Sequence, residues 1–166
     1  MWTSEGRRKR DALARAATFE GFDKLVNGVM AELPQTIIER VKSTGAGASS
    51  KGGAEQKFTT PYSSGWAKKR RAAGKQTSQK DFDYTGSFWN SFKLVGNQIT
   101  GSTLTFIYNV TGQNSDSRRS NNFLADAHSD SKHEGTNILY PNGKELQDLE
   151  EKLQQKVNEY FRNILR

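Results

Sequence analysis

Residues able to bind a metal ion or to transfer protons are concentrated in one short stretch of the chain. Five of them fall within nine residues: Asp126, His128, Asp130, His133 and Glu134. Imidazole and carboxylate groups are common ligands of divalent metals, so a metal-dependent nuclease or hydrolase is one interpretation. The two histidines are five residues apart, however, and do not share a helix face as those of an H-E-x-x-H motif do. We therefore favour a solvated polar loop over a metal site.

Other signatures of catalysis are absent from the sequence. The chain has no cysteine, which excludes thiol catalysis, disulfides and cysteine-based zinc sites. It contains no Walker or G-x-G-x-x-G pattern that would cradle a phosphate, and no Ser-His-Asp signature or nucleophile elbow. These observations predict a protein that is not an enzyme and that uses no cofactor and no metal ion.

Two clusters of basic residues could contact phosphate groups. One lies in the segment 1–12, which is predicted to be a basic arm, and the other lies in and after a short helical stretch that ends at Gly74. The members are Arg7, Arg8, Lys9 and Arg10 in the arm, and Lys68, Lys69, Arg70, Arg71, Lys75 and Lys80 in the second cluster. Lysine and arginine bind the nucleic-acid backbone independently of base sequence. The formal net charge of +7 agrees with contact with DNA, but docking between copies of the chain or a solvated helix face would explain it too.

Aromatic residues lie close to the second basic cluster in the sequence. Tyr62 and Trp66 are four residues apart, and so are Phe88 and Phe92, with Trp89 between the latter two. Exposed aromatic rings can stack on single-stranded bases. A spacing of four also places side chains on one face of a helix, and we favour packing in the core.

Helical periodicity is strongest at the two ends of the chain. Apolar residues at spacings of three and four predict a long helix that begins between residues 13 and 18 and ends at Leu33. Pro34 is expected to kink this helix, which then continues for one or two turns to Lys42. A second stripe predicts an amphipathic C-terminal helix that carries Leu146, Leu149, Leu153, Val157, Tyr160, Phe161 and Ile164.

The middle of the chain has the alternation of a β-hairpin. Residues 92–110 alternate apolar and polar side chains, with a two-residue turn expected at Gly101–Ser102 and the aromatic side facing the core. Before it, the Gly/Ser-rich segment 43–60 is predicted to be a flexible loop that becomes ordered against a neighbour. The sequence thus predicts a single α+β domain, 1–166, in which the C-terminal helix packs on a hairpin-based antiparallel sheet.

The composition limits how large a core this domain can have. Hydrophobic residues make up 33% of the 166 residues, below the usual share in soluble domains. Burial between copies of the chain would add to so thin a core. No apolar run approaches the roughly 20 residues that span a bilayer, and we expect no membrane contact.

Roughly residues 30–165 resemble bacteriophage neck, head–tail joining and tail-completion proteins, the minor tail protein Z-like family, and three blocks within residues 37–91 carry most of the resemblance. The family has an Ile-x-x-Arg helix end and a glycine-rich gap, followed by a Phe-x-x-Tyr-Ser-x-x-Tyr-Ala-x-x-Arg/Lys block. An Asp-Leu-Thr-x-Thr-Gly-x-Met/Phe-x-x-Ser block and a hairpin come next. Trp66 stands where the family has tyrosine, and Phe82–Tyr84 replaces its usual Leu and Thr. Ile37–Arg40 matches the first block, and the other matching residues are Phe58, Tyr62, Ser63, Trp66, Ala67, Lys69, Arg70, Asp83, Thr85, Gly86, Phe88 and Ser91.

This resemblance implies a structural protein of the virion, made in the cytoplasm of the host bacterium. Its copies would form a ring of six or twelve around the DNA channel at the head–tail junction. The implied partners are the neighbouring portal or connector and tail proteins, together with sequence-independent contact with packaged DNA. A cytoplasmic, sequence-independent nucleic-acid-binding protein is the alternative that the basic clusters leave open.

Overall fold

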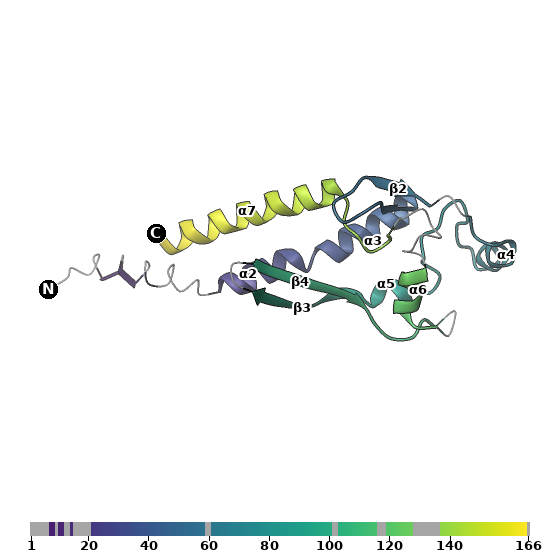
Figure 1. Cartoon of the computed structure of the whole chain (residues 1–166), viewed down its shortest axis with the longest axis horizontal. Helices are drawn as coiled ribbons and strands as arrows, with labels where there is room; N and C mark the ends of the chain where they lie inside the picture. Colours follow the sequence, from purple (N-terminus) through teal and green to yellow (C-terminus); the bar gives the residue numbers. More distant parts are fainter. Residues whose placement is uncertain are drawn as a thin grey trace. The chain divides into compact units, whose positions relative to one another are not determined.

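The computed structural model describes residues 7, 8, 10, 11, 14, 21–58, 61–100, 103–115, 119–127 and 137–165. Its mixture of helices and two small antiparallel hairpins confirms the predicted α+β class (Figure 1). In chain order the elements are α2 (Phe22–Met30), α3 (Leu33–Thr44), β1 (Ala46–Ala48), β2 (Glu55–Lys57), α4 (Ser64–Ala72), α5 (Ser87–Asn90), β3 (Phe92–Thr100), β4 (Thr103–Val110), α6 (Asn121–Ala127) and α7 (Gly143–Leu165).

Contacts divide the chain into two compact units. One spans Glu32–Leu146, and the other comprises the residues before and after that span. In the second unit, the ring of Phe22 in α2 meets the ring of Tyr160 in α7 edge to face, with 5.6 Å between centroids. The single domain over 1–166 stays a prediction, and the candidate site described below lies wholly in the unit Glu32–Leu146.

The break between the first two helices lies before Pro34. Helix α2 ends at Met30 and α3 begins at Leu33, so the predicted kink at Pro34 is wrong in position. Pro34 occupies the first turn of α3, where the missing N–H has no intrahelical acceptor to lose. Helix α3 then runs on to Thr44 and buries Leu33, Ile37 and Val41. The predicted helix start, apart from residue 14, lies outside the described residues.

The prediction of a flexible loop over 43–60 is wrong for most of that segment. Strands β1 and β2 form an antiparallel hairpin in which Ala46 pairs with Lys57 and Ala48 with Glu55. Ala46 and Ala48 are fully buried, and the backbone of Ala48 exchanges two hydrogen bonds with Asn137, at 3.0 and 2.9 Å. Small side chains allow this close backbone approach, although alanine and glycine have low strand propensity. Order here comes from the chain's own contacts.

Gly45 provides a test of this close packing. It ends α3 with a φ of 65°, and a Cβ at this position would lie 2.6 Å from Cβ of Gln79. We expect Gly45→Ala to lower the free energy of unfolding by about 2–4 kcal/mol, from left-handed backbone strain and overpacking together. Urea unfolding followed by circular dichroism measures the effect.

Gly74→Ala is the matched control for this substitution. Gly74 has a similar φ of 68°, but a Cβ there meets nothing within 4 Å. Only the cost of the left-handed backbone conformation remains, so the free energy of unfolding is expected to fall by about 1–2 kcal/mol. Equal losses in the two variants would contradict the tight contact with Gln79.

The predicted hairpin over 92–110 is confirmed as β3 and β4. Thr100 pairs with Thr103, and a bulge between Leu94 and Gly96 shifts the register; the predicted turn at Gly101–Ser102 lies outside the described residues. Among the described side chains of the hairpin, those deeply buried are Phe92 and Val110, at the end nearest the core. The expectation that one side of the hairpin faces the core is therefore correct only for that end. Three apolar side chains elsewhere on the hairpin are 40–48% exposed: Val95, Leu104 and Ile107.

The core of this unit is largely aromatic. Phe88, Trp89 and Phe92 are 2–5% exposed, and Phe88 and Trp89 pack edge to face with 4.8 Å between centroids. Phe88 and Trp89 come from α5, whose N-cap is Gly86 at a φ of 81°, and Phe92 begins β3. Their burial excludes these three rings as platforms for stacking bases.

The predicted C-terminal helix is confirmed as α7, and its first turn is fixed by a buried ion pair. Arg40 Nε lies 3.1 Å from Glu145 Oε1, with both side chains 6–7% exposed. Arg40 Nη2 also donates to the carbonyl of Tyr140 at 2.8 Å. Glu145 and Asn142 cap the helix reciprocally, because each side chain accepts from the other residue's backbone N–H at 2.8 Å. Among the described residues, no helix is long and apolar enough to cross a membrane.

Candidate functional site

The described basic residues of the predicted clusters are mostly exposed. In the arm this holds for Arg7, Arg8 and Arg10, whereas Lys9 lies outside the described residues. On and after α4 it holds for Lys68, Lys69, Arg71 and Lys75. Whether these residues face DNA or a docked subunit stays a prediction.

Arg70 differs from its neighbours because its side chain is buried, with 1% exposed. Its Nη2 donates to Asp81 Oδ2 at 2.8 Å, its Nε to the carbonyl of Gln76 at 2.8 Å, and its Nη1 to the carbonyl of Asp83 at 3.1 Å. The guanidinium also lies over the ring of Tyr62, 4.6 Å from the centroid. The prediction that Arg70 faces DNA or a neighbouring subunit is therefore wrong, because the side chain is buried and each guanidinium nitrogen donates to a partner within the chain.

Asp81 accepts hydrogen bonds from several side chains of this region. Besides the guanidinium, its carboxylate accepts from the hydroxyl of Tyr62 at 2.9 Å, from the side-chain amide of Gln76, and from the N–H of Asp83 at 3.0 Å. Its own N–H donates to Tyr62 Oη at 3.1 Å, and its carbonyl accepts from Trp89 Nε1 at 2.7 Å. Asp81 was not among the candidates from sequence, because nothing in its spacing marks it as the partner of a particular arginine.

Helix α4 positions the side chains around this acceptor. Ser63 caps the helix by accepting from the N–H of Trp66 at 3.4 Å. Trp66 and Arg70 are four residues apart and therefore share a helix face. The ammonium of Lys69 lies over two rings, 4.6 Å from the centroid of Trp66 and 4.9 Å from that of Tyr84. The four-residue spacing from Trp66 is a sequence signal that separates Arg70 from Lys68 and Arg71, but not from Lys69, which is three residues from Trp66 and contacts its ring.

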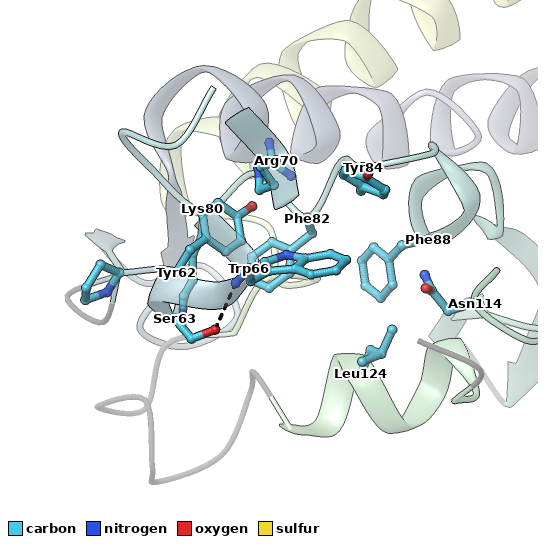
Figure 2. A pocket seen from close by; sticks show the side chains of 11 residues that line it. Tyr62, Ser63, Trp66, Arg70, Lys80, Phe82, Tyr84, Phe88, Asn114 and Leu124 are labelled. Atoms are coloured by element: carbon cyan, nitrogen blue, oxygen red, sulfur yellow. Dashed lines mark hydrogen bonds between the residues drawn. The ribbon is translucent and has the colours of Figure 1, made fainter. Parts of the chain in front are cut away.

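A cavity of about 360 Å³ lies beside Asp81 and its partners. Figure 2 shows rings of Trp66, Tyr84 and Phe88 arranged around it, with the side chain of Leu124 from α6 on another side. Arg70 and Lys80 are the only charged residues among the described lining. The cavity therefore combines aromatic walls with positive charge.

Phe82, which also lines the cavity, has a strained backbone. Its φ of 53° is the only positive value at a non-glycine residue in the described part of the chain. Such a conformation costs on the order of 1–3 kcal/mol and persists where surrounding contacts fix it. Here the ring packs against Phe58 and Phe88, with centroids 5.3 and 6.1 Å away. Aromatic packing thus holds a lining residue in a conformation that it would not adopt alone.

Lys80 is the lining residue whose charge has no counterion. It is 9% exposed, and within the described part of the chain it has neither a hydrogen bond nor an ion pair. Burial lowers the pKa of the Lys80 ammonium below its ordinary value of 10.5. Arg70, in contrast, is neutralised by Asp81.

Tyr62 gives this region a measurable pH dependence. Burial raises the pKa of the Tyr62 phenol to about 12, and burial does the same for Tyr108 in β4. Because both values lie above the ordinary 10, the neutral phenols stabilise the fold below pH 10, and this stabilisation is lost as the pH rises from about 10 to about 12. We expect ultraviolet titration to resolve two late phenol ionisations. Tyr62→Phe and Tyr108→Phe should each remove one of them; an unchanged late step in both variants would contradict the burial.

The remaining family-motif residues form the scaffold around the cavity. Ser91 Oγ accepts from Asn121 Nδ2 at 3.0 Å and donates to the carbonyl of Phe88 at 2.7 Å. Asn121, 1% exposed, thereby joins α6 to the end of α5. Asp83 forms an ion pair with Lys42 at 2.9 Å. These contacts are structural, and sequence reasoning missed Asn121.

The residues of the predicted metal-ligand cluster lie largely beyond the described part of the chain. Asp126 is exposed on α6, whereas His128, Asp130, His133 and Glu134 fall outside the described residues. Among the residues that are described, no group of three or more histidine or carboxylate side chains could hold a metal ion.

Comparisons with known proteins add no identification. No protein-family model, no curated protein and no solved structure matches the chain.

Proposed function

We propose that this protein is a structural subunit of a tailed bacteriophage, which assembles into a ring at the head–tail junction. The resemblance over roughly residues 30–165 suggests the class of protein. The structural observation that best supports it is the exposure of apolar side chains along β3 and β4.

The exposed hairpin residues are suited to two contacts per subunit. Leu104 and Ile107 are three residues apart in β4, so they point to opposite faces of the strand, and each is at least 40% exposed. Val95 lies in the bulge opposite Ile107 and is 48% exposed. Contact with neighbouring subunits would bury these side chains. A subunit in a ring contacts a neighbour on each side through different surfaces.

Assembly and particle composition test this function. We expect mass spectrometry to find the protein in purified virions of the encoding phage, and negative-stain microscopy to show Ile107→Glu impairing ring or particle assembly. Lys93→Glu, which also adds a carboxylate to an exposed position on the hairpin, is the control and should assemble normally. Absence of the protein from purified particles would overturn the proposal.

The basic face of α4 supports a second candidate, sequence-independent binding of nucleic acid. Helix α4 carries no acidic residue, and Lys68, Lys69, Arg71 and nearby Lys75 are exposed. Such binding to free duplex would weaken steeply as salt increases. Combined Lys68→Glu and Arg71→Glu substitutions should abolish it, and unchanged binding in that variant would exclude this candidate.

A further inference from the structure

We propose that the cavity lined by Trp66, Tyr84, Phe88 and Lys80 binds a carboxylate attached to a flat apolar body. The inference does not depend on the proposed role in a virion. It rests on the chemistry of the cavity wall, which offers one uncompensated cation and several aromatic faces.

Lys80 selects an anion. The Lys80 side chain is 9% exposed and its ammonium nitrogen is not fully enclosed by protein, and the described part of the chain supplies it with no hydrogen bond or ion pair. No acidic residue is present among the described residues that line the cavity. A bound carboxylate would provide the missing counterion as a charge-assisted hydrogen bond.

The charge balance favours a single negative charge. Arg70 also lines the cavity, but Asp81 neutralises its guanidinium at 2.8 Å and two carbonyl groups accept from its Nε and Nη1. One free cation therefore remains in the described lining. This matches a carboxylate better than a phosphate, which carries up to two charges and offers three acceptor oxygens.

The aromatic lining of the cavity favours a ligand with a flat apolar part. Trp66 and Tyr84 stand with ring centroids 5.1 Å apart, and Phe88 and Leu124 line the same space (Figure 2). The volume of about 360 Å³ is near the lower end of pockets that bind small molecules, and it suits one ring with a short chain.

Binding of matched acids and amides tests the proposal on the full-length protein. The first pair is 3-phenylpropionate and 3-phenylpropanamide, and the second is N-acetyl-Gly-Phe as free acid and as amide. Saturation-transfer NMR and tryptophan fluorescence report binding. We expect the acid of at least one pair to bind about tenfold or more tightly than its amide, which corresponds to about 1.4 kcal/mol. Preference in the first pair indicates a free small molecule as ligand, and preference in the second indicates the end of a polypeptide.

Substitution of Lys80 completes the test. Lys80→Met should remove the preference for the acid, and it should leave the melting temperature unchanged or raised, because it replaces an unpaired charge on a largely buried side chain by an apolar group. Lys75→Met, at an exposed lysine nearby, is the control and should keep the preference. Lys80→Gln serves the same purpose if the methionine variant fails to fold. The proposal is overturned if neither acid is preferred over its amide, or if the preference persists without Lys80.

Discussion

Replacing Asp81 by asparagine is expected to lower the free energy of unfolding by about 3–5 kcal/mol, because it leaves the buried guanidinium of Arg70 without a counterion. The amide also has only one oxygen, whereas the carboxylate of Asp81 accepts from Arg70, Tyr62, Gln76 and the N–H of Asp83. In any orientation its NH₂ group must face one of these donors. Urea unfolding monitored by circular dichroism and tryptophan fluorescence measures the loss.

Asp83→Asn is the control for this prediction, since it makes the same chemical change two residues later. The Asp83 carboxylate is 25% exposed and pairs with Lys42, which is 40% exposed. Exposed pairs of this kind contribute about 1 kcal/mol or less. Adding Arg70→Met to Asp81→Asn should recover part of the lost stability, because the unpaired charge is then gone. Equal losses for Asp81→Asn and Asp83→Asn would refute the central role of Asp81.

Replacing Glu145 by alanine is expected to have an effect of similar size. Arg40 would lose its buried counterion, at a cost of about 3–5 kcal/mol, and α7 would lose the side chain that accepts from the N–H of Asn142, which adds about 1 kcal/mol. Glu145→Gln keeps an oxygen for the cap but removes the charge. The difference between the two variants in urea unfolding therefore measures the cap separately from the ion pair.

Glu151→Ala provides the comparison on the same helix. Glu151 is exposed, and its side chain accepts only from Gln147, at 3.0 Å, among the hydrogen bonds of the described residues. We expect its loss to change the free energy of unfolding by less than about 0.5 kcal/mol. A comparable loss for Glu145→Ala would show that the ion pair with Arg40 contributes little.

The elements that could be predicted from sequence are those whose pattern is local. Helix α7 carries a continuous apolar stripe, and β3–β4 alternates over both strands, so each is identified by its own residues. Strands β1 and β2 have no such pattern. They are stabilised by pairing with each other and by the contact of Ala48 with Asn137, far away in the sequence. The Gly/Ser-rich composition therefore led to the prediction of a flexible loop where the segment is ordered.

The candidate site was harder to predict for a related reason. Within the run of basic residues at 68–71, one guanidinium is buried while its neighbours are exposed, and composition does not distinguish them. Position on the helix face does so in part, through the spacing of Arg70 from Trp66. The unpaired state of Lys80 depends on which residues enclose it in three dimensions. No local sequence pattern predicts this three-dimensional arrangement.

The two buried ion pairs also differ in when they can form during synthesis of the chain. Arg70 and Asp81 are 11 residues apart, so closing the loop between them costs little entropy, and it becomes possible as soon as that short segment leaves the ribosome. The hydrogen bond of Arg40 to Tyr140 spans 100 residues, and the neighbouring pair with Glu145 must wait at least as long. The region around Asp81 can therefore be ordered early in translation, whereas Arg40 stays without its counterion until the start of α7 has been made.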